Sequence, residues 1–179
     1  RDGADEMPPD QREQVLVGEL GKGWRESFEF FDERPIAAAS IGQVHRARTM
    51  GARTLDGGID VAIDVAVKVQ YPGVATSINS DLGNLQRIVN LLNIVPKGLF
   101  IDSVISVGRE ELTAECDYVN ERNNQERFRS LVGEDAELQS LNVYVPKTIP
   151  HLSSKAVLTT EFCLGGNIDA CVSLPQAVR

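Results

Sequence analysis

The residues best suited to do chemistry lie around one lysine. Lys68 ends the alternating run Val65-Ala66-Val67-Lys68, a turn of small residues at 37–40 precedes it, and an acidic stretch at 110–121 follows it. A small-residue turn brings backbone close to a polyanion, and a lysine supplies positive charge to phosphate oxygens. A carboxylate can hold such a long, flexible side chain in place. The order of these features indicates a phosphate-binding site.

Taken one at a time, these features have simpler interpretations that the residues alone leave open. The alanines of the turn fit a close-packed strand connection, and alanine disfavours positive φ, so this loop should be stiffer than a glycine-rich one. Lys68 fits a solvated lysine on an edge strand. The acidic run fits a solvated helix face; its members are Glu110, Glu111, Glu115, Asp117 and Glu121.

Composition excludes several classes of protein. The chain has 179 residues, 42% of them hydrophobic and 25% charged, which is typical of one globular domain or slightly more. A net charge of −8 argues against nucleic acid as a partner. No apolar run approaches the ~18 residues of a membrane helix. Three cysteines without a CxxC pair, and only two histidines, argue against a zinc site and favour free thiols in a reducing compartment.

Hydrophobic spacing predicts the elements that position the lysine. Three-to-four spacing predicts a helix over 10–31, broken near Gly21 and Gly23, after which 36–48 reads as strand, turn and strand. Residues 50–60 read as a flexible, acidic hairpin loop. Strict alternation predicts a strand over 61–69 with Lys68 on the face opposite the valines.

The second half of the chain is predicted to be helical and then extended. Helices are expected over 76–94 and over 102–131, the latter with Asp102 as its N-cap. Two strands are expected over 142–149 and 156–162, joined at Pro150. A glycine-containing connector and the start of another helix near residue 168 follow.

Several spaced motifs resemble the UbiB-type atypical kinase family. They run from about Trp24 to Gly166 in the family's order. They are PIAAASIGQVHRA (35–47), VAVKVQYPGV (65–74), SINSDLGNL (77–85), GLF (98–100), ELTAECDYVNERNNQERF (111–128) and VLTTEF (157–162). The mitochondrial branch, which supports ubiquinone (coenzyme Q) biosynthesis, is the most similar.

The resemblance implies a fold and a set of ligands. It implies an α+β protein-kinase-like N-lobe with a mostly antiparallel sheet of about five strands and inserted and flanking helices. It also implies binding of ATP with Mg²⁺, and ATPase or small-molecule kinase activity. The implied division is a helical extension at 1–34, the N-lobe at 35–164, and the hinge with the start of a C-lobe at 165–179.

Roles follow by position from the same resemblance. The alanine-rich loop that covers the phosphates is Ala37, Ala38, Ala39 and Ser40, and the nucleotide-binding lysine is Lys68. The residues that position a lysine are Glu121, Glu115 and Asp117. Glu121 is the expected partner of Lys68, with Glu115 as the alternative. At the hinge, Glu161 and Cys163 are expected to offer backbone groups to adenine.

The sequence also departs from the family pattern. The family's KxGQ motif, whose lysine meets Glu115 and Asp117, is missing, and nothing after residue 166 matches a catalytic-loop Asp and Asn or a metal-binding Asp-Phe-Gly. No metal ligand is assigned in this chain, and we expect the chain alone to have no turnover.

Two functions therefore remain open. The first is part of an ATP-binding atypical kinase or ATPase that supports ubiquinone biosynthesis on the matrix side of the mitochondrial inner membrane. The second is a pseudokinase-like binding module for lipid intermediates or biosynthetic proteins, with peripheral membrane association. A soluble domain without a nucleotide site is disfavoured by the motif order.

Overall fold

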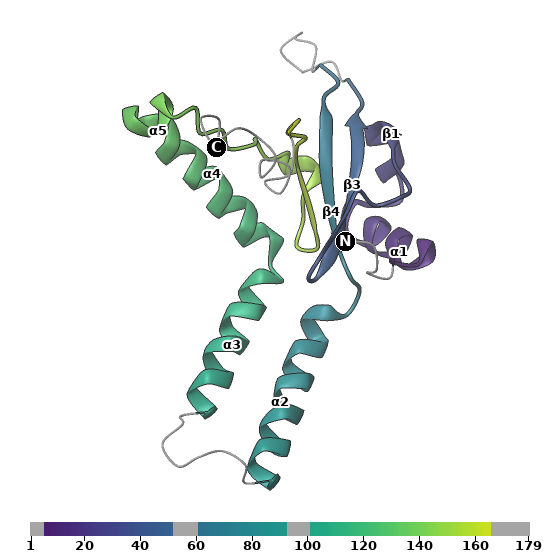
Figure 1. Ribbon diagram of the computed structural model, residues 1–179. Coiled ribbons are helices and arrows are strands. Elements are labelled where there is room, and N and C mark those ends of the chain that lie inside the picture. The colour runs from purple at the N-terminus through teal and green to yellow at the C-terminus, as the bar shows by residue number, and fades with distance from the viewer. Residues whose placement is uncertain (1–5, 52–60, 93–100, 166–179) are drawn as a thin grey trace, which may run out of the picture.

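The protein is an α+β fold built on a five-stranded antiparallel sheet. The computed structural model describes residues 6–51, 61–92 and 101–165 (Figure 1). The strands are β1 (Phe28–Phe31), β2 (Ala37–Ala39), β3 (Gly42–Thr49), β4 (Asp64–Gln70) and β5 (Val157–Glu161). Their order is β1-β3-β4-β5, and β2 also pairs with β3. The predicted fold class is confirmed.

Five helices and two short 3-10 turns accompany the sheet in the described part of the chain. They are α1 (Pro9–Leu20), α2 (Val74–Leu92), α3 (Ile101–Glu115), α4 (Tyr118–Glu134) and α5 (Ala136–Ser140), with short 3-10 turns η1 (Trp24–Ser27) and η2 (Pro150–Leu152). Helices α2 and α3 run side by side away from the sheet, and α4 rises beyond β5 (Figure 1). None of the helices in the described part of the chain has the length and apolarity to cross a bilayer.

The two faces of the sheet differ chemically, as the side chains of strand β4 show. Its valines, Val65, Val67 and Val69, are fully buried, whereas Ala66 and Lys68 lie on the other, partly open face. The valine face joins the main core, which also contains Met7, Leu16, Trp24, Phe28, Ile149, Leu152 and Val157. The predicted alternation is confirmed, although the strand begins at Asp64 rather than Val61.

A second, smaller cluster lies on the opposite face of the sheet, near the C-terminal end of β4. Ile41 from the turn between β2 and β3 packs with Cys116, Tyr118 and Leu158, and Val74 and Ile78 of α2 pack against them. This cluster connects the small-residue turn, α2, the start of α4 and β5. It therefore supports the face of the sheet on which Lys68 lies.

The helix predicted over 10–31 is wrong in its second half. Helix α1 stops at Leu20, before Gly21 with φ 90°, and Phe28–Phe31 form β1. The rings of Trp24, Phe28 and Phe31 pack edge to face with centroids 5.0–6.1 Å apart. Their three-to-four spacing imitates a helix, but pairing of β1 with β3 decides the conformation of this segment.

The single helix predicted over 102–131 is also wrong, because the chain breaks at Cys116–Asp117. There Asp117 Oδ1 accepts hydrogen bonds from the N–H groups of Val119 and Asn120, at 3.1 and 3.3 Å, and starts α4 as its N-cap. The expected cap at residue 102 has a side chain outside the described residues. Two elements are thus present where continuous periodicity predicted one.

The strand predicted over 142–149 is not formed. Only Thr148 bridges to the sheet, opposite Thr160, while β5 is present as predicted. The loop predicted at 50–60, apart from residues 50 and 51, the helix from 168, and Cys171 lie outside the described residues.

Candidate functional site

The centre of the site is an ion pair between β4 and α4. Lys68 Nζ donates to both carboxylate oxygens of Glu121, at 2.9 Å each. The side chains are 24% and 39% exposed, so the pair is partly shielded from water. Of the two expected partners, the structure brings Glu121 to Lys68, and no ion pair joins Lys68 to Glu115, which is also described.

The start of helix α4 explains why Glu121 lies next to Lys68. The Asp117 cap fixes the first turn of α4, and the N–H of Tyr118 donates to Lys155 O at 3.1 Å, in the turn before β5. Glu121 stands one helical turn further on, where it faces β4. Asp117 thus acts on the helix backbone, and no ion pair joins it to Lys68 among the described residues.

Tyr118 is a neighbour of Lys68 that no motif in the sequence indicates. Its ring centroid lies 4.4 Å from Lys68 Nζ, and the residue is fully buried. Burial raises the pKa of its phenol, which keeps the hydroxyl neutral. The signal that could have found it is spacing, since residues three apart share one helix face and Tyr118 precedes Glu121 by three.

An open cavity of about 430 Å³ lies beside the ion pair. Its lining residues come from the turn after β2, from β4, and from the facing ends of α3 and α4: Ser40, Ile41, Lys68, Ala114, Glu115, Asn120, Glu121 and Asn124. Four residues expected in the site, Ser40, Lys68, Glu115 and Glu121, line it. Ala37, Ala38 and Ala39 form β2 instead, paired with Val44, Gln43 and Gly42.

The turn above the cavity is held against β4. The N–H of Tyr71 donates to Ile41 O at 2.9 Å, and a Cβ on Gly42 would lie 2.3 Å from Val69 O. Only glycine allows the two backbones to approach so closely. The position of the turn over Lys68 is therefore set by backbone contact.

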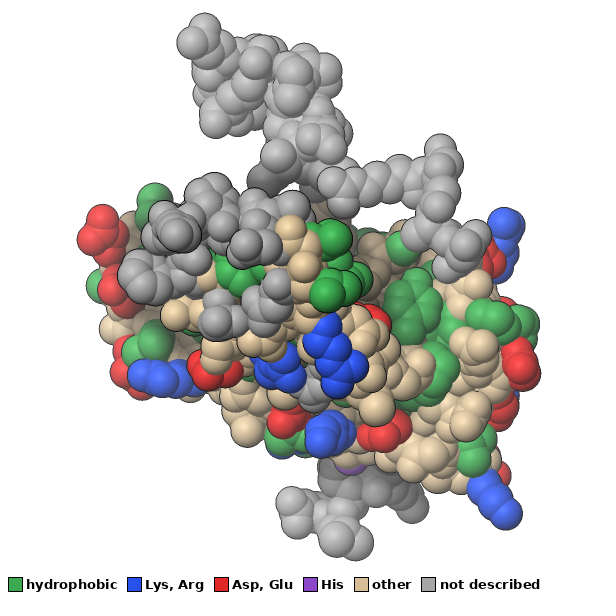
Figure 2. Space-filling view, turned by 90° about the horizontal axis from the view of Figure 1, so that it is seen from below, with side chains coloured by type: hydrophobic (Ala, Val, Ile, Leu, Met, Phe, Trp, Pro, Cys, Tyr) green, Lys and Arg blue, Asp and Glu red, His purple; other side chains and the backbone are tan. Residues whose placement is uncertain are grey.

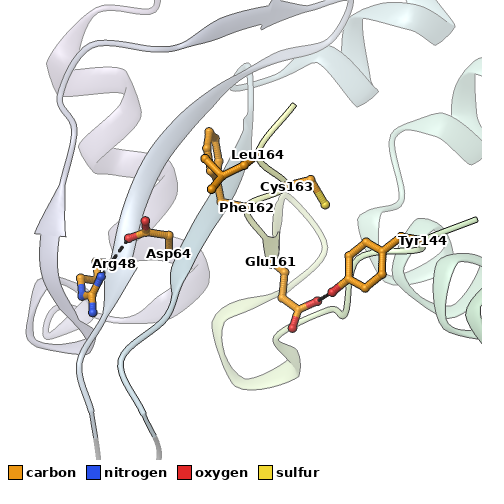
Figure 3. A pocket seen from close by; sticks show the side chains of 7 residues that line it. All are labelled: Arg48, Asp64, Tyr144, Glu161, Phe162, Cys163 and Leu164. Carbon is orange, nitrogen blue, oxygen red and sulfur yellow. Dashed lines mark hydrogen bonds and ion pairs between the residues drawn. The ribbon is translucent and has the colours of Figure 1, made fainter. Parts of the chain in front are cut away.

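The expected hinge residues lie at the end of β5, around a second open cavity of about 470 Å³ (Figure 3). Glu161 points toward Tyr144 and accepts hydrogen bonds from its hydroxyl and from the N–H of Lys147. These bonds lower the pKa of Glu161, the tyrosine contributing most, and the pKa of Tyr144 is correspondingly raised. Cys163 is exposed beside it as a free thiol. The Glu161 carboxylate is thus already hydrogen-bonded to the 144–147 segment.

The opposite wall of this cavity carries charges from β3 and β4. Asp64 pairs with Arg46 at 2.9 Å and with Arg48 at 3.3 Å, and Arg46 lowers the pKa of Asp64 most. The Arg46 guanidinium also lies 4.9 Å from the centre of the Phe162 ring. Together with Ala66, these side chains form the open face of the sheet between the hinge and Lys68.

No cluster of three or more His, Cys, Asp or Glu side chains suited to a metal ion occurs within residues 6–51, 61–92 and 101–165. The cationic group that the structure places at the wall of the cavity of about 430 Å³ is the Lys68 ammonium, held by Glu121.

A five-stranded antiparallel sheet with a strand lysine paired to a helix glutamate defines the N-lobe of a protein-kinase-like fold. The family model described as "ABC1 atypical kinase-like domain" matches residues 1–178. This chain belongs to that family, and the resemblance to UbiB-type atypical kinases is confirmed.

Individual relatives agree with this assignment. The chain is 46% identical over 179 residues to "Atypical kinase coq-8, mitochondrial" of Caenorhabditis elegans, covering 100% of this chain and 22% of that protein. It is 44% identical over 165 residues to "Atypical kinase COQ8, mitochondrial" of Schizosaccharomyces pombe, covering 92% and 25%. The chain thus spans about a quarter of the curated relatives it matches.

A solved structure shows the same fold. The complex of Rv3197 with erythromycin from Mycobacterium tuberculosis matches with a TM-score of 0.71 and 31% identity, over 94% of this chain and 39% of that one. The kinase-like architecture expected from the sequence is therefore shown by both sequence and structure.

Proposed function

We propose that this chain forms the nucleotide-binding part of an ATP-dependent atypical kinase or ATPase. We further propose that the whole protein supports ubiquinone biosynthesis at the matrix side of the mitochondrial inner membrane. The observation that carries the first proposal is Lys68, held by both oxygens of Glu121 at the wall of a cavity bordered by the small-residue turn. The mitochondrial names of the relatives support the second.

Different residues of the chain contact different parts of ATP in this proposal. Lys68 presents its ammonium to the α- and β-phosphates, and Glu121 prevents it from swinging into solvent. The strand and turn from Ala37 to Ser40 cover the phosphates. Backbone groups of Cys163 and the carbonyl of Glu161 face the adenine, because the N–H of Glu161 is already bonded to Lys147 O. Asp117 positions Lys68 indirectly, by capping the helix that carries Glu121, and Glu115 at the cavity wall is available to a lysine from a preceding helix. Bound Mg²⁺ neutralises phosphate charge, and none of its ligands is assigned to the described residues.

Thermal unfolding of the full-length protein with Mg·ATP tests this proposal. A site filled at about 100 times its dissociation constant stabilises the folded state by about 2.7 kcal/mol. We expect most of that gain to vanish in Lys68→Ala and to persist in Lys155→Ala, which removes an exposed lysine. A folded wild-type protein that Mg·ATP does not stabilise would contradict the proposal.

A second candidate, a binding module that uses nucleotide only as a switch, is favoured by the surface of α2 and α3. Leu91 and Val104 are 84% and 64% exposed, and other apolar side chains of these helices are half exposed: Leu85, Ile88, Leu92 and Val107. On the face shown in Figure 2, hydrophobic side chains lie among interspersed acidic and basic ones. Nucleotide-dependent stabilisation without ATP turnover in the full-length protein would favour this module, with lipid intermediates or biosynthetic proteins as partners.

A further inference from the structure

The ring of Tyr118 and the carboxylate of Glu121 contact the same Lys68 ammonium. The ring lies 4.4 Å from the Lys68 ammonium, while the Glu121 carboxylate contacts the same ammonium at 2.9 Å. The lysine is thus held by a π face and a carboxylate that both come from the first turn of α4. The carboxylate keeps the ammonium from moving into solvent, and the ring face restricts the flexible four-carbon side chain from a second side.

The surroundings of Tyr118 make its ring a rigid support. The residue is fully buried in the cluster with Ile41, Cys116 and Leu158, and its N–H is bonded to Lys155 O. Its hydroxyl lies near the Gln70 side chain but makes no hydrogen bond of normal distance and angle to a described residue. The ring, rather than the hydroxyl, is therefore the part that acts on its neighbours.

We propose that Tyr118 is a positioning residue, whose ring face fixes the Lys68 ammonium at the wall of the cavity for an anionic phosphate ligand. The inference rests on the proposed function in that the ligand of Lys68 is a nucleotide. It goes further by assigning part of the nucleotide affinity to a residue that contacts the lysine but does not line the cavity. Because this contact is already present in the free protein, removing the ring weakens nucleotide binding only through lost positioning of the ammonium, by up to about five-fold.

The first test is Mg·ATP affinity of the full-length protein, with variants that separate ring from hydroxyl. Tyr118→Phe keeps the ring and should bind within about two-fold of wild type, whereas Tyr118→Leu keeps apolar bulk and should bind about five-fold more weakly. In a Lys68→Met background the leucine variant should cause no further loss. A folded Tyr118→Leu protein with wild-type affinity would overturn the proposal.

A second test needs neither nucleotide nor the leucine variant. Aromatic ring currents shift protons above a ring face upfield, so the ε-methylene protons of Lys68 in ¹³C-lysine-labelled protein should lie upfield of those of exposed lysines. Lys68→Arg assigns the signal, and Tyr118→Phe should retain the shift. Absence of the shift in wild type overturns the inference. The shift together with absent ATP binding would refute the proposed function and leave the positioning contact standing.

Discussion

Replacement of Gly42 by alanine should destabilise the protein through a backbone collision. The added Cβ would lie 2.3 Å from Val69 O and 3.0 and 3.1 Å from the Val69 carbonyl carbon and Gln70 Cα, whereas ordinary contact begins at 3.4 Å. These atoms are all backbone of β4, so no side chain can rotate away. Strands β3 and β4 would have to separate by about 1 Å at this point, near the hydrogen bond from Tyr71 N–H to Ile41 O.

The size of the effect follows from these contacts. Overpacking costs about 1–3 kcal/mol, and loss of a strand hydrogen bond adds about 1 kcal/mol, for a total of about 2–4 kcal/mol in the free energy of unfolding. Gly83 provides the control, because its Cβ would meet nothing within 4 Å in α2. Gly83→Ala should stabilise the protein by about 0.5–1 kcal/mol.

Urea denaturation of both variants, with hydrogen exchange along β3 and β4, measures this difference. Gly42→Ala should lower the midpoint and accelerate exchange near Tyr71, while Gly83→Ala should do neither. A Gly42→Ala protein with a free energy of unfolding within about 0.5 kcal/mol of wild type would refute the reasoning.

Three further predictions follow from single contacts. Burial lowers the pKa of His45, so stability is complete above the unfolded pKa of about 6.5 and falls as pH drops below it; thermal melts of His45→Asn should show a smaller fall. Asp117→Ala should cost about 1 kcal/mol in urea denaturation and Asp117→Asn far less, because asparagine also caps helices. Tyr144→Phe should raise the pKa of Glu161 toward its ordinary value in a carboxyl ¹³C NMR titration, since the phenol is the main cause of its lowering.

The His45 prediction has a structural reason that the sequence alone does not show. Its Nδ1 is bonded to Asp32 O at 2.8 Å, and its Nε2 lies 3.0 Å from Gln43 Nε2, while Gln43 Oε1 accepts from Met7 N–H. A carbonyl can only accept, so His45 Nδ1 donates and Nε2 accepts. Protonation of Nε2 would set two donors against each other and disrupt the chain of bonds that reaches Met7.

Strand positions were predictable where the pattern was local. The period-two run ending at Lys68 and the hairpin around Ser40 carry their own signal in β-branched and small residues. Phe28–Phe31 carry no such signal, because their spacing fits a helix and only pairing with β3 makes them extended. The break before Tyr118 was missed because Asp117 sits inside an otherwise continuous helical pattern.

The site could be predicted only in part for a similar reason. Lys68 and Glu121 are 53 positions apart, and no local pattern links them. The expectation that they pair came from resemblance to a family, whereas the contact of Tyr118 with Lys68 depends on how α4 starts against the sheet. Three-residue spacing on α4 places Tyr118 and Glu121 on one face, but only the fold shows which strand that face meets.

The burial of Ile41 helps to keep the turn above the cavity in its closed position. This side chain is only 7% exposed, in a cluster that includes Val74 and Ile78 of α2. Lifting the turn would return it to water at a cost of about 2 kcal/mol, and breaking the hydrogen bond from Tyr71 N–H to Ile41 O adds to that cost, so the open population at 25 °C is at most on the order of 3%. Entry of a ligand that needs the lifted turn would draw on this minor population, and any change in how α2 packs on Ile41 would alter the apparent association rate.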